Sequence, residues 1–317
     1  MSQDDQPDPP PAPPPPANPW ATPATWSAPT APPSGQWPPQ QYQSSGALPP
    51  LRPVVTKRRA PGQIYWGLGQ VWLGLGVAIG LNLVVSIAAL IIWIAAHPAA
   101  LTPGNSSILT QQILNDLTSS PWFVLASLVT LWAGFLLGIF VASYGYGQRS
   151  LRLDFGWRFV WRTDVLYGMG LAIVLRGADF AYNVFLNAIG VDTKAVDNSA
   201  PIVDQKGIGL ILVVLAASFG APIVEELFFR GLTLRALQKR WGAVVGIIGS
   251  SVLFGILHAQ PTSTGAFGLQ SLWLVAFTAS LGAVFAWVAV RTQRLGITVI
   301  AHVTFNFSAL VIALLLK

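Results

Sequence analysis

Residues 210–230 read LILVVLAASFGAPIVEELFFR, and two adjacent glutamates, Glu225 and Glu226, interrupt this otherwise apolar stretch. They are the only glutamates in the chain. A membrane-spanning helix needs about 20 mainly apolar residues, so the stretch predicts such a helix. An ionisable side chain at the centre of such a helix costs about 2.5–3.5 kcal/mol on insertion scales. We therefore expect the two carboxylates to belong to a polar site inside the bilayer.

The composition of the whole chain indicates an integral membrane protein. Of 317 residues, 53% are hydrophobic and only 9% are charged, whereas soluble domains carry about 25% charged residues. The chain has no cysteine, which excludes disulfides, thiolate metal sites and a cysteine nucleophile. The N-terminus has neither a basic start nor an apolar core, so we expect the first membrane helix to act as the targeting signal.

Residues 1–62 differ from the rest, since they hold 19 of the 25 prolines. Such a segment buries too little apolar surface to fold, and it is predicted to be a disordered cytoplasmic tail with polyproline II character. A ligand for SH3-like or WW-like domains, or a self-association segment, is the alternative interpretation, and the binder is unknown.

Residues 63–317 are predicted to form the transmembrane domain, an all-α, polytopic membrane helix bundle of about seven helices. Pro222 can break the fourth segment by opening a new helix at its first turn. The apolar runs predict spans at residues 66–96, 122–146, 164–190, 207–236, 242–259, 270–290 and 296–316.

Basic residues alternate between the predicted loops, which sets the expected orientation. Thirteen of the 18 fall in alternate connections, so the positive-inside rule predicts a cytoplasmic N-terminus and a multi-pass protein of the plasma membrane. The net charge of +6 is then a topology signal with anionic-lipid contact, and no nucleic-acid partner is expected. These residues are Arg52, Lys57, Arg58, Arg59, Arg149, Arg152, Arg158, Arg162, Arg235, Lys239, Arg240, Arg291 and Arg294.

The spacing of the charged residues predicts different surroundings for the two glutamates. Glu226 and Arg230 are four residues apart and can pair on one helix face, whereas Glu225 points about 100° away from Glu226. Adjacent carboxylates in different environments can take separate roles. The alternative is that the Glu226–Arg230 pair only holds helices together. Arg176 and Asp179, three apart in the third span, are also expected to pair.

Two further polar groups lie in the last spans. Phe254 and His258 share a helix face, as do His302 and Asn306. Together with the glutamates they can converge on one pocket that activates a water and stabilises an oxyanion, or that binds zinc. The predicted topology puts His258 near the outer end of its span and His302 nearer the cytoplasm. The fifth span must therefore start deeper or tilt, with residues 235–245 partly buried.

These residues occur in an order and spacing that resemble a known family, the CPBP intramembrane proteases. The family includes CAAX prenyl endopeptidases of the Rce1 type and bacteriocin-processing and immunity proteins. The resemblance covers about residues 205–316, with no departure at the motif positions. The three motifs are Glu225-Glu226-x-x-x-Arg230, Phe254-x-x-x-His258 and His302-x-x-x-Asn306.

The resemblance implies an endopeptidase of glutamic or metallo type. Glu225 would be the general base for the attacking water, helped by His258, and His302 and Asn306 would stabilise the oxyanion. Supporting roles would fall to Glu226, Arg230 and Phe254. No cofactor is favoured, because asparagine suits an oxyanion better than zinc. A competing zinc site would use Glu225, Glu226, His258 and His302.

We therefore predict that the protein hydrolyses peptide bonds in membrane-associated proteins or peptides. The lack of organelle signals favours a bacterial plasma membrane as its location. Whether the substrate is prenylated stays open. A non-enzymatic immunity or scaffold protein is one alternative, and a proton-coupled transporter using Glu225 and the histidines as a relay is another. The binding function of an immunity or scaffold protein would persist without the Glu225 carboxylate, whereas the flux through a transporter would be lost.

Overall fold

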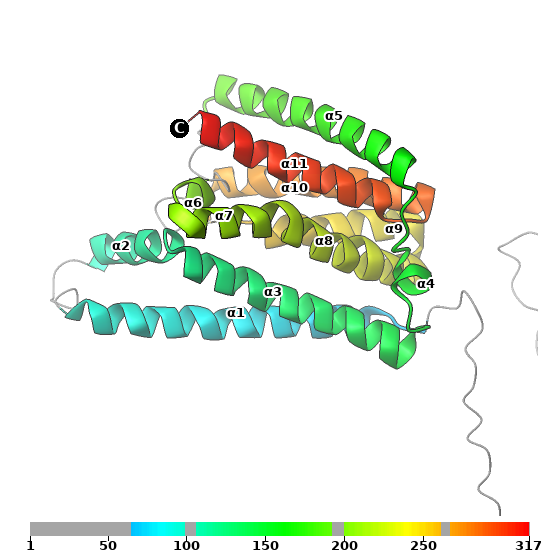
Figure 1. Ribbon diagram of the computed structural model, residues 1–317, viewed down its shortest axis with the longest axis horizontal. Helices are drawn as coiled ribbons and strands as arrows, with labels where there is room; N and C mark the ends of the chain where they lie inside the picture. The colour runs from blue at the N-terminus through cyan, green and yellow to red at the C-terminus, as the bar shows by residue number, and fades with distance from the viewer. Residues whose placement is uncertain (1–64, 99–105, 192–199, 261–266, 317) are drawn as a thin grey trace, which may run out of the picture. The chain divides into compact units, whose positions relative to one another are not determined.

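The computed structural model describes residues 65–98, 106–191, 200–260 and 267–316. The tail predicted at residues 1–62 lies outside these ranges. The described residues form helices and no β-strand, which confirms the all-α class. In chain order (Figure 1) the elements are α1 (Leu68–Ala96), α2 (Ser106–Thr118), α3 (Pro121–Phe140), η2 (Val141–Tyr146), α4 (Leu151–Phe155), α5 (Trp161–Ala188), α6 (Ala200–Val203), α7 (Gly207–Leu215), η4 (Ala216–Gly220), α8 (Ala221–Glu225), η5 (Glu226–Thr233), α9 (Leu234–Leu257), α10 (Leu269–Thr292) and α11 (Gly296–Leu315).

Six helical stretches among the described residues are long and apolar enough to cross a membrane. The sequence led us to expect about seven, and the difference lies in Gly207–Leu257, which is one helical run of 51 residues. A straight helix of that length would extend about 75 Å, far beyond a hydrocarbon core of about 30 Å. This run therefore has to bend or fold back.

Gly242 divides the long run in two. Its φ of 84° and ψ of 173° are non-helical, and glycine reaches positive φ without a steric penalty. A side-chain carbon at Gly246 would lie 3.1 Å from the Leu234 carbonyl oxygen, and one at Gly249 would lie 3.0 Å from Leu237 Cδ1. Residues so far apart along one straight helix could not meet, so the chain folds back here. The segments predicted at 207–236 and 242–259 are two antiparallel helices.

The helix that carries the glutamates does not break at Pro222, but its hydrogen-bonding pattern changes along its length. It passes from α7 into the π-helical segment η4, then into α8, and then into a second π-helical segment, η5. Pro222 lies in the first turn of α8, where its missing N–H is tolerated. The break that we considered at this point is therefore a local widening of a continuous helix. Such π-helical segments are rare and often mark functional sites.

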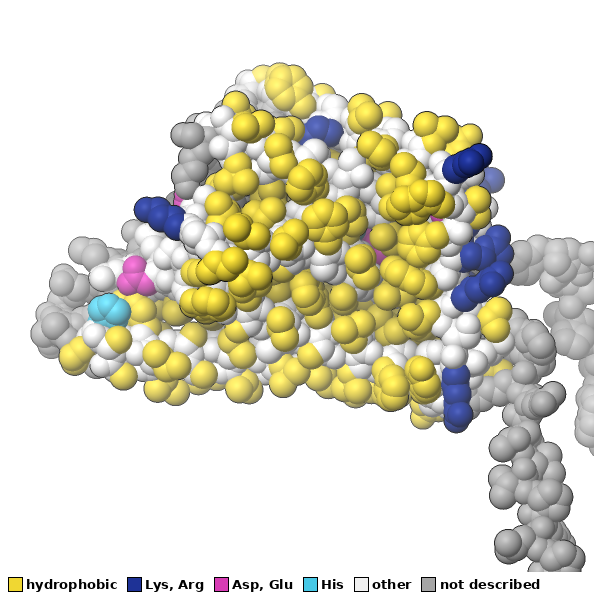
Figure 2. Space-filling model, in the orientation of Figure 1, with side chains coloured by type: hydrophobic (Ala, Val, Ile, Leu, Met, Phe, Trp, Pro, Cys, Tyr) yellow, Lys and Arg dark blue, Asp and Glu magenta, His cyan; other side chains and the backbone are white. Residues whose placement is uncertain are grey.

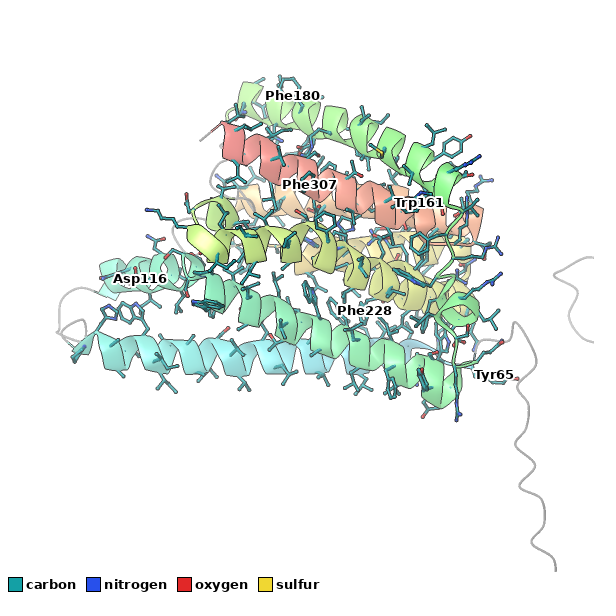
Figure 3. The ribbon with its side chains drawn as sticks, in the orientation of Figure 1. Tyr65, Asp116, Trp161, Phe180, Phe228 and Phe307 are labelled. Carbon is teal, nitrogen blue, oxygen red and sulfur yellow. The ribbon has the colours of Figure 1, made fainter. Side chains whose placement is uncertain are left out.

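One side of this helix is covered by α3, which packs in turn on α1. Small residues let α1 and α3 approach closely, and a side-chain carbon at Gly138 would lie only 2.8 Å from the Gln70 carbonyl oxygen. Phe135 of α3 stacks on Phe228 of η5 with ring centroids 4.2 Å apart. Phe228 is completely buried at this contact (Figure 3). The aromatic packing positions the residues that follow the glutamates.

The other side of the helix is covered by α11, against which α5 packs. A second buried cluster, which includes Leu175, Leu281, Phe285 and Ala301, joins α5, α10 and α11. The elements thus follow one another in space as α1, α3, α8, α11 and α5 (Figure 1). Hydrophobic side chains cover most of the face drawn in Figure 2, and most of the Lys and Arg side chains visible there lie at its right-hand end. Glu225 ends α8 and Glu226 begins η5, so both glutamates lie in the middle of this row of helices.

Candidate active site

Glu226 and Arg230 form the buried centre of the site. Arg230 Nη1 lies 3.1 Å from Glu226 Oε1, and the two side chains are 1% and 0% exposed. The pair predicted from the four-residue spacing is therefore present. Because neither charge reaches solvent, removing one partner would leave the other uncompensated.

Aromatic rings enclose the Arg230 guanidinium. Its central carbon lies 4.3 Å from the Phe254 ring centroid and 5.4 Å from that of Phe285, within the range for cation–π attraction. Arg230 Nη2 also donates to the Gly282 carbonyl at 3.3 Å. Phe254 was expected at the site from its motif, whereas Phe285 and Gly282 of α10 were not. Neither carries a motif or a charge that could have indicated a place in the site.

His302 connects the two glutamates. Its Nδ1 lies 3.1 Å from Glu226 Oε1, and its Nε2 lies 3.7 Å from Glu225 Oε2. The ring packs edge-on against Phe254 and at a tilt against Phe285, with centroids 5.9 Å and 5.3 Å away. The glutamates themselves differ, since the Glu225 side chain is 16% exposed and that of Glu226 is fully buried. The 100° separation expected on the helix thus corresponds to different surroundings.

His258 follows the last residue of α9 and lies next to Phe254 rather than next to the glutamates. Its Nδ1 is 2.8 Å from the Phe254 carbonyl oxygen, and its ring centroid is 4.4 Å from that of Phe254. A proton on Nδ1 would satisfy that contact and leave Nε2 as the basic nitrogen. Within the described residues, no hydrogen bond or ion pair joins His258 to Glu225 or Glu226.

The structure also resolves the depth conflict between the two histidines. Both rings pack against the ring of Phe254, so they meet at one level of the bundle. The chain reaches that level because it folds back at Gly242, which buries Leu234 and Ala236 at 2% exposure each. The partial burial that we expected near residues 235–245 is confirmed for residues 235–238 and for Ala243, whereas residues 239–242, 244 and 245 are exposed.

Asn306 binds the glutamate helix at its first π-helical segment. Its Nδ2 donates to the Ala217 carbonyl at 3.1 Å. In the i-to-i+5 pattern opened by the Ala221 N–H bond to Ala216 O, the next donor would be residue 222, which is a proline without an N–H. The Asn306 amide replaces that missing donor. Pro222 and Asn306, distant in sequence, are therefore complementary.

A zinc site is not evident among these side chains. No group of three or more His, Asp or Glu in the described ranges is arranged to hold a metal ion. Glu226 Oε1 already contacts both Arg230 and His302, and His258 lies apart at Phe254. A structural or catalytic zinc takes at least three protein ligands, so the arrangement does not fit the four-residue zinc set.

Comparison with known proteins covers the same region. Residues 207–308 match the family model described as type II CAAX prenyl endopeptidase Rce1-like. The chain is also 29% identical over 161 residues to the putative membrane peptidase YdiL of Bacillus subtilis (strain 168). That alignment covers 50% of this chain and 57% of the relative, so the chain spans little more than half of the relative's length. No solved structure matches.

The matched segment contains all three motifs, from Glu225 to Asn306. The resemblance inferred from those motifs is confirmed by both comparisons. Residues 207–308 of this chain are therefore similar to an Rce1-like domain, and both comparisons support the CPBP family for this segment.

Proposed function

We propose that this protein is an intramembrane endopeptidase that hydrolyses peptide bonds of membrane-associated proteins or peptides. The proposal rests on the different burial and contacts of the two glutamates. Glu226 is fully buried and contacts Arg230 and His302. Glu225 keeps part of its side chain exposed, and its ion-pair contact within the described residues is the longer one to His302. An accessible carboxylate beside a histidine is what activation of a water requires.

In the proposed reaction, Glu225 takes a proton from a water whose oxygen attacks the substrate carbonyl carbon. The resulting oxyanion accepts hydrogen bonds from His302 Nε2–H and from the Asn306 amide. An amide nitrogen has two hydrogens, so Asn306 can bind Ala217 O with one and the oxyanion with the other. When the intermediate collapses, the C–N bond breaks and the proton on Glu225 passes to the leaving amine.

Glu226 and Arg230 have a supporting role in this proposal. The contact between Glu226 and His302 Nδ1 orients the ring, and both ring nitrogens are donors when the imidazole carries two protons. Arg230, held by Phe254 and Phe285, keeps Glu226 in place. His258 can assist the water through its Nε2, since its Nδ1 is occupied at the Phe254 carbonyl. The step uses no metal, in line with the poor fit of the zinc set.

The proposed substrate class follows from the location of the site between apolar helices. A peptide bond must enter from the bilayer or its surface to reach Glu225. The description of the family model makes prenylated CAAX ends the first substrates to test. We also propose that the protein lies in a bacterial plasma membrane with its basic end towards the cytoplasm, in agreement with the positive-inside rule.

The test compares peptide termini in membrane fractions of cells that express wild type or Glu225→Gln at matched levels. New termini with the wild type alone are the expected result. Asp116→Asn is the matched control, because it makes the same acid-to-amide change at an exposed position on α2 (Figure 3). The control should give the wild-type termini. Identical termini in all three strains, with each protein folded, would reject the protease and favour a binding or immunity role.

A further inference from the structure

A cavity of about 410 Å³ lies at the basic end of the described bundle, outside the candidate active site. Its lining residues are Ser150, Arg152, Leu153, Gly156, Arg158 and Gln293. They come from α4 and its flanks and from the end of α10. Figure 2 shows Lys and Arg side chains at the end of the molecule where Figure 1 places α4.

The positive charge at this cavity is not neutralised within the described residues. Four arginines of one short segment are exposed, and none has an ion-pair or hydrogen-bond partner for its side chain there. They are Arg149, Arg152, Arg158 and Arg162. An anion in the cavity would meet guanidinium groups whose donors are free.

The two acidic residues nearest to these arginines in the chain are already committed. Asp154 is buried and accepts hydrogen bonds from the Ser143 hydroxyl at 2.7 Å and from the Gln148 N–H at 2.9 Å. Asp164 is fully buried, pairs with Arg294 at 2.9 Å and accepts from the Val160 N–H at 2.7 Å. Neither carboxylate therefore competes for the cavity arginines.

Exposed apolar side chains lie among the arginines of the same segment. Leu153 is 60% exposed and Trp161 is 70% exposed, and Val160 lies beside Trp161 with 44% exposure. Trp161 begins α5 at this end of the bundle (Figure 3). Arginine next to exposed aliphatic and tryptophan side chains is typical of the headgroup layer of a membrane. A soluble anion or a nucleic acid would have no use for the apolar part.

We propose that the cavity lined by Arg152 and Arg158 binds the phosphate headgroup of an anionic phospholipid, with the acyl chains against Leu153 and Trp161. Basic pockets at the ends of membrane helices bind such headgroups. The site lies before the Rce1-like segment in the chain, and its occupancy does not depend on the protease proposal.

The lipid would hold a segment that touches the catalytic helix. Phe155 ends α4 and is fully buried. A side-chain carbon at Gly231, the residue after Arg230, would lie 3.0 Å from Phe155 Cβ. The Leu295 N–H also donates to the Gly156 carbonyl at 3.0 Å, which ties the same segment to the start of α11. Headgroup binding at α4 therefore stabilises the positions from which η5 and α11 present their motifs.

The experiment titrates the full-length protein in neutral detergent with phosphatidylglycerol and measures the dissociation constant by native mass spectrometry. Arg152→Gln/Arg158→Gln should weaken binding by roughly fivefold for each arginine removed. The matched control, Arg149→Gln/Arg162→Gln, removes the same charge from the same segment outside the cavity lining. It should bind like the wild type. If the double variant does not fold, each single cavity variant should show its fivefold loss.

Three results would overturn the proposal. An equal loss of affinity in the control variant would mean that the lipid responds to diffuse surface charge. Phosphatidylcholine binding as tightly as phosphatidylglycerol would remove the role of the negative charge. Inorganic phosphate displacing the lipid at similar concentration would identify a free-anion site in place of a lipid site.

Discussion

In the described part of the chain, two acid–arginine pairs each join neighbouring turns of one membrane helix, and they are built alike. In η5, Glu226 pairs with Arg230 at 3.1 Å, and in α5, Arg176 pairs with Asp179 at 2.7 Å. Each arginine also packs on a phenylalanine ring and donates to a carbonyl of another helix, Gly282 for Arg230 and Phe305 for Arg176. The pairing expected for Arg176 and Asp179 is thus confirmed.

The pairs differ in what surrounds them. The Arg176 and Asp179 side chains are each 23% exposed, and Asn183, the additional partner of Asp179, lies on the same helix. The Glu226–Arg230 pair is buried, and His302 from α11 joins it and also approaches Glu225, the carboxylate outside this pair. A charged pair in a membrane helix is therefore weak evidence of catalysis by itself. The distinguishing feature is a further carboxylate that the arginine does not neutralise.

The largest effect is expected from Glu225→Gln. It should lower kcat by about 10³–10⁴-fold, because the proposed general base is lost, while the unfolding temperature stays near that of the wild type since Glu225 is partly exposed. Peptide cleavage and thermal unfolding, measured on the same detergent-purified sample, check both parts. Substantial cleavage by a folded Glu225→Gln enzyme would remove Glu225 from the mechanism.

Glu226→Gln should mainly reduce stability. The Arg230 charge would remain buried without its partner, at a cost of about 3–5 kcal/mol. Asp179→Asn is the comparison, because the same change in the partly exposed pair should cost about 1 kcal/mol or less. Unfolding of both variants under identical detergent conditions tests the contrast between the pairs. Equal losses of unfolding free energy would show that burial does not make the two pairs differ in their contribution to stability.

Asn306→Ala should lower kcat by about 10²–10³-fold with little change in KM, as expected for the loss of one oxyanion donor. Loss of its bond to Ala217 should reduce stability by only about 0.6 kcal/mol. Steady-state kinetics on a cleavable peptide separate the two parameters. A rise in KM at constant kcat would instead assign Asn306 to substrate binding.

Arg176→Gln should cost about 1–2 kcal/mol of stability, since it removes an interhelical hydrogen bond and a cation–π contact with Phe305. The kcat per folded molecule should stay within about twofold of the wild type. Arg176→Lys keeps the charge but loses the planar stacking group, so its stability should lie between that of the wild type and that of Arg176→Gln. A large fall in kcat for Arg176→Gln would place the α5 pair in the catalytic machinery.

Removal of metal should have the smallest effect. Chelator treatment of the active enzyme is expected to leave its rate unchanged, because the site residues do not form a three-ligand set in the described part of the chain. Elemental analysis of the same sample provides the check. One zinc per chain, lost together with activity and restored with it, would replace the proposed mechanism with a metal-dependent one.

Local sequence patterns were sufficient for much of the site. The Glu226–Arg230 and Arg176–Asp179 pairs follow from i,i+4 and i,i+3 spacing, because residues so separated are neighbours on any helix. The count of spans was less direct. Residues 207–257 form one helical run by hydrogen bonding, and the positive φ of Gly242 together with the close approach of Gly246 to Leu234 shows that it folds back.

The sequence by itself determined that this is a helical membrane protein with three polar motifs in a CPBP arrangement, because hydrophobicity and helical periodicity are properties of short segments. The tertiary structure decided which groups meet. It brought His302 between the two glutamates, placed Phe285 and Gly282 around Arg230, and set Asn306 opposite the carbonyl that Pro222 leaves without a donor. These contacts join residues of different helices, and their geometry depends on how whole helices pack, which no periodicity along one helix records.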